Sequence, residues 1–223
     1  GVAHEINNPL AIINEKAGLM KDIISFSKDF DLKDEFLKHN DSIINSVSRC
    51  RSITHRLLGF ARRFDINFEK LDINSIVKEV LGFLEKEASY RQVELILALD
   101  AEIPEVFSDK GQVQQVFLNI LTNALAAVDN GGKIEIRSYY LSDQKMIGID
   151  FKDNGYGMNE EVKKHIFDPF FTTKQGQGTG LGLSITYGIV KKLKGKISFE
   201  SRENQGTTFT ILLPEEETYE SMA

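Results

Sequence analysis

The sequence predicts two units of different fold class: an all-α helical hairpin over residues 1–63, then an α+β two-layer sandwich over residues 73–214. Three observations predict this division. Residues 1–63 repeat apolar side chains at helical spacing and show no strand-like alternation. After residue 72, helical segments mix with short alternating segments typical of strands. Residues 64–72 are expected to be a linker, and residues 215–223 an acidic tail.

Two apolar seams define the helical hairpin. The first seam consists of Ile6, Leu10, Ile13, Ala17, Met20 and Ile24. The second consists of Phe36, Asn40, Ile43, Val47, Cys50, Thr54, Leu57 and Ala61. The polar stretch between them, from Ser27 to Lys33, predicts the turn of an antiparallel pair. Because two helices leave each seam half covered, we expect a homodimer that forms a four-helix bundle. Packing of the hairpin on the second unit of its own chain is the alternative.

The second unit is expected to contain helices at residues 73–89, 109–129 and 181–193. Asp109 is the expected N-cap of the middle helix, and Gly131-Gly132 is expected to end it. Strands are expected at residues 93–99, 133–140, 146–152, 196–201 and 207–213, with a turn at Asn204-Gln205-Gly206. Strands that pair mostly antiparallel, mixed with helices, give an α+β sandwich.

Composition excludes several classes of protein. The net charge of −6 argues against a general nucleic-acid binder, which needs a basic face. The single cysteine, Cys50, excludes an intrachain disulfide and a cysteine-only metal site. No apolar run approaches the roughly 18 residues of a membrane span, and no signal peptide is recognisable. The chain starts without Met, so we expect a cytoplasmic fragment whose membrane contact, if any, belongs to upstream segments of the parent.

A histidine with reactive neighbours lies at the start of the first helix. His4 and Asn8 are four residues apart, so we expect them to share a helical face away from the apolar seam. A neutral imidazole nitrogen can be a nucleophile near pH 7, and the carboxylate of Glu5 can fix its tautomer. Pro9 removes the donor for the Glu5 carbonyl and predicts a kink. For His4 and Glu5 taken alone, a surface histidine with a solvated neighbour is the plainer interpretation.

Polar and glycine-rich segments of the second unit suit a nucleotide. Asn119 and Asn123 project from one helical face, and their amide oxygens suit Mg²⁺, although two surface amides are the alternative. A carboxylate at a strand end, Asp153, can accept from the exocyclic amine of adenine. The glycines after it let the backbone approach the ring, in the run Asn154, Gly155, Tyr156 and Gly157. A turn signal alone explains Asn154-Gly155 but not Asp153.

A second glycine-rich run opens the last helix, where backbone N–H groups bind phosphate. Its candidate residues are Gly178, Thr179, Gly180, Leu181 and Gly182. The run matches neither the Rossmann nor the Walker pattern. The segment between Met158 and Gly182 is expected to form a lid over the nucleotide, with aromatic anchors that include Phe167 and Phe170. Thr172, Thr173 and Lys174 then supply hydroxyls and a cation near the phosphates, with a solvated Lys174 as the alternative.

Taken together and in this order, these segments resemble the H, N, G1 and G2 boxes of sensor histidine kinases. The run His4-Glu5-x-x-Asn8-Pro9 is similar to the H box, and Phe167 to Lys174 closely resembles the F box. The resemblance implies that His4 accepts the phosphoryl group and Glu5 acts as general base. It also implies that Asn8 positions water for dephosphorylation of a partner protein.

Residues 73–214 resemble the ATP-binding domain shared by histidine kinases, gyrase, MutL and heat-shock chaperone ATPases. The resemblance implies that Asp153 binds adenine with help from Thr207, and that Asn123 holds Mg²⁺. Relatives that hydrolyse ATP directly usually carry Glu at the position of Asn119. Since an amide is a poor base, we expect this site to pass phosphate to His4 rather than to water.

The implied activity is autophosphorylation of His4 by ATP, followed by transfer to an aspartate on a response-regulator receiver domain. A phosphatase-biased module that uses Asn8 is one alternative. A dimeric nucleotide-sensing scaffold without chemistry is another, and the intact motif residues count against it. A serine-protein kinase of the same fold is a further alternative, but such kinases lack the hairpin that carries the histidine.

Overall fold

The computed structural model describes residues 2–30, 32–44, 46–47, 67–173 and 179–215. The chain forms two compact units, Gly1–Phe64 and Asp65–Ala223. None of the described helices is long and apolar enough to cross a membrane.

The first unit is a helical hairpin, as the two seams predict. Helix α1 spans Val2–Phe26, and the described part of the second helix covers residues 33–44 and 46–47. Lys33 closes the turn, because its Nζ donates to the carbonyl of Ser27 at 2.9 Å. An ion pair of 2.9 Å between Lys21 and Asp41 then links the two helices.

The hairpin covers only part of its apolar seams. Ala17, Asn40 and Val47 are buried. Other seam residues remain 44–51% exposed, namely Ile13, Met20, Phe36 and Ile43. Both polar atoms of the Asn40 amide are buried and have no hydrogen-bond partner among the described residues. The predicted seam positions from Cys50 to Ala61 lie outside the described residues.

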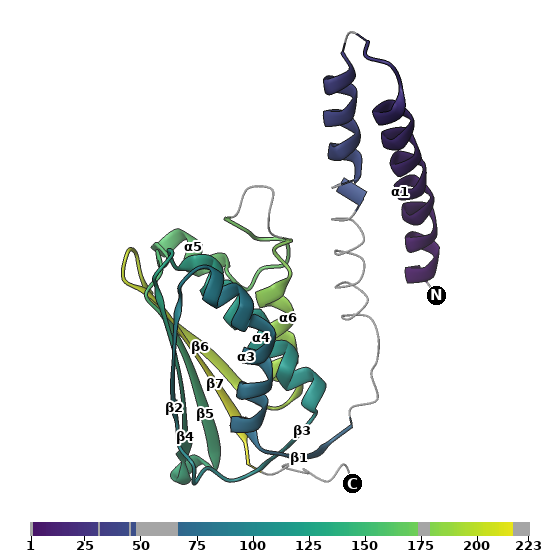
Figure 1. Ribbon diagram of the computed structural model, residues 1–223. Coiled ribbons are helices and arrows are strands. Elements are labelled where there is room, and N and C mark those ends of the chain that lie inside the picture. The colour runs from purple at the N-terminus through teal and green to yellow at the C-terminus, as the bar shows by residue number, and fades with distance from the viewer. Residues whose placement is uncertain (1, 31, 45, 48–66, 174–178, 216–223) are drawn as a thin grey trace. The chain divides into compact units, whose positions relative to one another are not determined.

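The second unit is an α+β two-layer sandwich built on a five-stranded sheet (Figure 1). Its strands are β2 (Glu94–Leu99), β4 (Lys133–Leu141), β5 (Met146–Asp153), β7 (Gly206–Pro214) and β6 (Lys196–Arg202), in spatial order. The β2–β4 pair is parallel and the other three pairs are antiparallel. The expected strands and their largely antiparallel pairing are therefore confirmed. The parallel pair is joined by a long connection that includes a helix, as parallel strands require.

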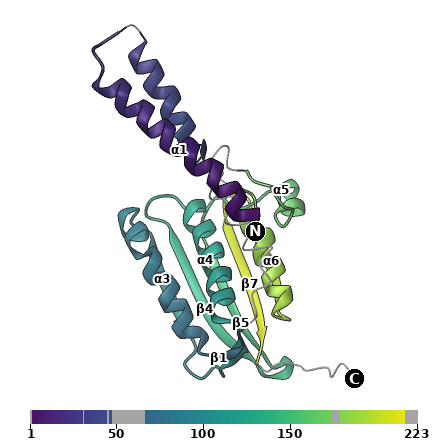
Figure 2. The same ribbon diagram turned by 90° about the vertical axis from the view of Figure 1, so that its right-hand side faces the viewer.

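Three helices cover one face of this sheet: α3 (Ile73–Tyr90), α4 (Lys110–Ala127) and α6 (Gly182–Lys192) (Figures 1 and 2). The predicted cap of α4 is confirmed, because the Asp109 side chain accepts from the Gln112 backbone N–H at 2.9 Å. Asp72 caps α3 in the same way. Each cap satisfies an N–H group that has no partner within its helix.

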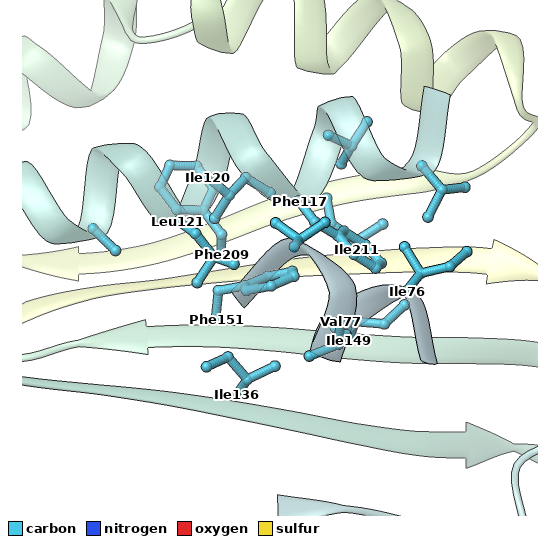
Figure 3. Close-up of a cluster of buried hydrophobic side chains, with 14 of the residues drawn as sticks. Ile76, Val77, Phe117, Ile120, Leu121, Ile136, Ile149, Phe151, Phe209 and Ile211 are labelled. Carbon is cyan, nitrogen blue, oxygen red and sulfur yellow. The ribbon is translucent and has the colours of Figure 1, made fainter. Parts of the chain in front are cut away.

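The core lies between this helical layer and the sheet (Figure 3). Phe117 of α4 meets Phe151 of β5 with ring centroids 5.2 Å apart. The strands place every second side chain in the core, as Ile134 and Ile136 of β4 show. This packing fixes α4 on the sheet. The asparagines of α4 and the residue at the end of β5, Asp153, therefore have defined positions relative to each other.

Four short elements were not predicted: β1 (Glu69–Leu71), β3 (Val106–Ser108), the 3₁₀ helix η1 (Ser142–Gln144) and α5 (Glu160–His165). β1 and β3 pair antiparallel, so part of the expected linker is a strand. Segments of three to six residues are too short to show a periodicity. Helix α5 lies within the segment that was expected to be a lid.

Candidate functional site

Asp153 is the last residue of β5, and only 6% of its surface is exposed. Its Oδ1 accepts from the backbone N–H of Gly155 at 2.8 Å and of Thr207 at 3.2 Å. Its Oδ2 makes no hydrogen bond with the described part of the chain. Burial raises the pKa of Asp153, although the two backbone hydrogen bonds oppose that shift. One carboxylate oxygen is thus fixed, and the other remains available to a donor.

The turn between β6 and β7 packs directly on the loop after Asp153. Gly206 has φ of +92°, and a Cβ there would overlap the backbone carbonyl of Asp153. Gly157 has φ of +63°, and a Cβ there would overlap the carbonyl of Arg202. The backbone N–H of Asn204 donates to the carbonyl of Tyr156 at 2.7 Å. Both glycines are therefore required by backbone conformation and by close approach.

The same loop also packs on the C-terminal end of α4. The backbone N–H of Tyr156 donates to the carbonyl of Ala127 at 3.2 Å, and a Cβ on Gly155 would overlap that carbonyl. The side-chain oxygen of Asn154 accepts from the backbone N–H of Lys133 at 2.7 Å. Asn154 therefore joins the loop to the start of β4, and its oxygen is already engaged.

The two asparagines of α4 have different surroundings. The Asn119 Nδ2 donates to the carbonyl of Gly182 at 3.3 Å and to the Oγ1 of Thr186 at 3.2 Å. Asn119 therefore links α4 to the first turn of α6. Asn123 is half-buried and makes no hydrogen bond within the described residues, so both of its polar atoms are free for other ligands.

The glycine-rich run leads directly into α6. Gly180 has φ of +65°, and its carbonyl accepts from the backbone N–H of Phe170 at 2.9 Å. A Cβ on Gly180 would overlap the Phe170 backbone, so Gly180 lies directly against a residue in the middle of the expected lid. Leu181 is the N-cap residue of α6 and supplies no side-chain cap, so within the described residues no cap competes with an anion for the N–H groups of the first turn. The predicted site residues Lys174 and Gly178 lie outside the described residues.

The aromatic residues of the expected lid have separate roles. Phe167 is partly buried and packs against the core, with its ring 5.1 Å from that of Tyr187 and 5.8 Å from that of Phe199. Phe170, in contrast, is 63% exposed. Thr172 and Thr173 follow it and are exposed as well. The segment is thus anchored at Phe167 and presents Phe170 and the threonines at the surface.

The predicted residues of the first unit all lie on α1. Helix α1 contains His4, Glu5 and Asn8 and continues through Pro9 without a break. His4 and Asn8 therefore lie one helical turn apart. The side chains of residues 1–9 lie outside the described part of the structure, so the predicted exposure of His4 and Asn8 stays a prediction.

Comparison with known proteins agrees with this arrangement. A family model described as histidine kinase-, DNA gyrase B- and HSP90-like ATPase matches residues 108–217. The catalytic domain of histidine kinase ThkA superposes with a TM-score of 0.61 and is 35% identical, over 67% of this chain and 96% of that domain. The chain belongs to the sensor histidine kinases. The resemblance seen in the sequence motifs is thereby confirmed.

Other sensor kinases extend the likeness to the helical hairpin. Sporulation kinase E of Bacillus subtilis (strain 168) is 34% identical over 214 residues, which cover 96% of this chain and 28% of that kinase. The chain thus spans less than a third of this curated relative. A structure of histidine kinase ThkA in complex with response regulator protein TrrA is 29% identical with a TM-score of 0.69, over 96% of this chain and 60% of that one.

The structure of this kinase domain also identifies residues that the motifs did not single out. Gly206 and Asn204 hold the β6–β7 turn against the Asp153 loop. The Ser201 hydroxyl lies 2.9 Å from the Thr207 hydroxyl and fixes it. The turn at Asn204-Gln205-Gly206 was predicted as a turn, and its glycine was the available signal. That the turn packs on Asp153 depends on the β5–β7 register, in which Asp153 pairs with Thr207.

Proposed function

We propose that this chain is an ATP-dependent protein-histidine kinase that phosphorylates its own His4 and passes the phosphoryl group to an aspartate of a response regulator. The buried Asp153 carboxylate is the observation that carries the proposal. With Oδ1 held by two backbone N–H groups, Oδ2 can accept from the exocyclic amine of adenine. The kinship with sensor kinases supports the same activity.

The rest of the nucleotide is assigned to the elements around Asp153. Gly155 and Gly157 bring backbone close to the base, and Thr207 completes the adenine contacts. The triphosphate is assigned to the N-terminal end of α6, where Gly180, Leu181 and Gly182 present backbone. Further contacts are assigned to Phe170, Thr172, Thr173, Lys174, Gly178 and Thr179.

Mg²⁺ is assigned to Asn123, with Asn119 beside it. The donor set fits the ion, because Mg²⁺ prefers oxygen ligands and keeps several waters alongside substrate phosphates. Within the described residues the Asn123 amide makes no hydrogen bond, and the Asn119 Oδ1 accepts none while Nδ2 donates to α6. Within the described residues, no cluster of three or more acidic, histidine or cysteine side chains offers another metal site. Bound there, the ion would neutralise charge on the transferring phosphoryl group.

The transfer is written as a direct displacement. A ring nitrogen of His4 attacks the γ-phosphorus, an N–P bond forms, and the bond from that phosphorus to the β–γ bridging oxygen breaks. ADP leaves with the electron pair, and Glu5 accepts the imidazole proton. In the second step, a carboxylate oxygen of the receiver aspartate displaces His4 from phosphorus. ThkA has been seen bound to a response regulator, which supports this class of partner.

A homodimer is proposed for the first unit. The half-exposed seam residues of the hairpin, Ile13, Met20, Phe36 and Ile43, need a cover, and a second hairpin provides it. Asn8 is proposed to support dephosphorylation of the regulator, since α1 keeps it one turn from His4. Light scattering tests the dimer. Loss of phosphate from a phosphorylated receiver, compared between wild type and Asn8→Ala, tests the second role.

The deciding experiment is incubation with γ-labelled ATP and Mg²⁺. We expect acid-labile, alkali-stable label in the wild type and none in His4→Ala. His39→Ala is the matched control, because His39 lies on the second helix of the same hairpin with an exposed side chain. Label that persists in His4→Ala would exclude His4 as the acceptor. Tight ATP binding without label in any variant would favour the scaffold alternative.

A further inference from the structure

Arg91 connects two helices of the ATP-binding unit. It is the C-cap residue of α3, where its backbone N–H donates to the carbonyl of Glu87 at 3.0 Å. Its guanidinium reaches the end of α4 and donates to the carbonyls of Leu125 at 2.5 Å and Val128 at 2.6 Å. The Nε donates to the side chain of Asn130 at 3.3 Å. One side chain therefore holds the last turn of α4 and the loop after it.

The end of α4 has no cation of its own. None of the residues in its last turn is basic. The final carbonyls of a helix lack partners within the helix and carry partial negative charge, so a cation there is favourable. Arg91 supplies both the charge and the donors from a neighbouring element. Its planar guanidinium offers donors in a fixed fork, which a lysine ammonium does not.

The end of α4 also supports the loop after Asp153, residues 154–157, which we call the adenine loop. The carbonyl of Ala127 lies between Leu125 and Val128 in sequence, and it accepts from the backbone N–H of Tyr156. Gly155 lies directly against the same carbonyl. A shift of the last turn of α4 therefore moves the segment that holds Asp153 through Gly155.

The loop after α4 provides a second connection. The carbonyl of Arg91 accepts from the backbone N–H of Gly131 at 3.0 Å, and that loop leads into β4 at Lys133. The backbone N–H of Lys133 in turn donates to the Asn154 side chain. Arg91 is thus connected to the adenine loop by two routes, through the end of α4 and through the start of β4. It lies outside all the sequence motifs.

We propose that Arg91 is a positioning residue for adenine recognition, which acts on the Asp153 loop through the C-terminal end of α4. This inference rests on the proposed function of Asp153 in binding ATP. Arg91 does not touch the nucleotide. Arg91 sets the position of the Asp153 carboxylate, so removing Arg91 should weaken the contacts to the adenine base and leave the contacts to the phosphates unchanged.

The test compares Arg91→Ala and Arg91→Lys with wild type in autophosphorylation of the full chain. For Arg91→Ala we expect the KM for ATP to rise about tenfold, with kcat within about twofold of wild type, because small displacements weaken binding at one end of the substrate. The preference for ATP over GTP should fall with it. Arg91→Lys keeps the positive charge but loses the planar guanidinium, so its KM for ATP should lie between those of wild type and Arg91→Ala.

Two further variants separate positioning from stability. Asn74→Ala removes hydrogen bonds to Asp100 and Ser138, which lie at the opposite end of β2 and β4, and should lower the Tm without a change in KM. Arg91→Ala combined with Gln92→Gly should restore Tm, since Gln92 has φ of +55°, but should keep the raised KM. A double variant with wild-type KM and base preference would overturn the inference.

The proposed function is checked separately with Asp153→Asn. If that variant binds ATP like wild type, Asp153 does not recognise adenine, and the proposed function fails whatever Arg91 does. If Asp153→Asn no longer binds ATP while the Arg91 variants bind ATP with wild-type affinity, only the proposed role of Arg91 is wrong.

Discussion

Asp153→Asn isolates the role of the second carboxylate oxygen. The amide oxygen of Asn can still accept from the backbone N–H groups of Gly155 and Thr207, so the loop keeps its hydrogen bonds. The other oxygen becomes an NH₂ group, which faces the amine of adenine as donor against donor. We expect ATP binding to be lost while the fold is kept.

The expected loss can be worked from these contacts. A hydrogen bond to a charged group contributes about 1.5–3 kcal/mol, and a donor left unsatisfied in a buried site costs about 1–3 kcal/mol. A combined change of about 3–4 kcal/mol corresponds to a fall in affinity of about two to three orders of magnitude. Titration calorimetry with a non-hydrolysable ATP analogue measures it directly. An affinity within about threefold of wild type would refute the adenine assignment.

The same substitution should not destabilise the unliganded protein. Burial raises the folded-state pKa of Asp153 above its unfolded value, so its ionised form is disfavoured in the folded state. Its contribution to stability is present below the unfolded pKa and is lost as pH rises through the folded pKa. At neutral pH, Asp153→Asn should therefore melt at the wild-type temperature or higher, and the difference should shrink as pH falls toward 4. A lower Tm at pH 7 would contradict this account.

Three other substitutions test the packing. Gly206→Ala should destabilise the protein by at least about 3 kcal/mol, because it combines a positive φ with overlap on the Asp153 carbonyl. Gly82→Ala is its control: nothing lies near the added Cβ within α3, so urea denaturation should show a gain of about 0.5–1 kcal/mol. Equal effects at the two glycines would contradict the close approach at Gly206. Asn40→Leu should raise the stability of the hairpin by about 1–3 kcal/mol, since it removes a buried amide that has no partner in the described part of the hairpin. A lower denaturation midpoint would mean that the Asn40 amide finds a partner in the dimer.

The sequence predicts elements well where the signal is local and long. Helices α3 and α4 have regular apolar faces and aspartate caps, and their predicted limits agree with the structure to within two residues. β1 and β3 were missed because a three-residue strand shows no periodicity, and each of the two forms only by pairing with the other. Their pairing links residues more than thirty positions apart, which no local pattern records.

Site residues follow the same rule. The family resemblance assigned Asp153 and Thr207 to adenine recognition, and the strand register brings these two residues side by side. It also placed Asn119 and Asn154 among the nucleotide contacts by motif position. Spacing gives the face of a helix but not the partner, so the hydrogen bonds of Asn119 to α6 and of Asn154 to Lys133 could not be foreseen. Arg91 was missed for the same reason, because its partners are backbone carbonyls.

Asn119 shows why an amide suits this position for two separate reasons. Relatives that hydrolyse ATP directly usually carry Glu there, and an amide cannot take the proton of an attacking water. The structure adds that the Asn119 Nδ2 donates to the carbonyl of Gly182, and an ionised carboxylate has no proton to donate. A glutamate would therefore introduce a base and at the same time lose the hydrogen bond to the carbonyl of Gly182. Under the function proposed above, Asn119 both denies an attacking water its base and links α4 to the start of α6, so ATP hydrolysis and the position of α6 are expected to change together.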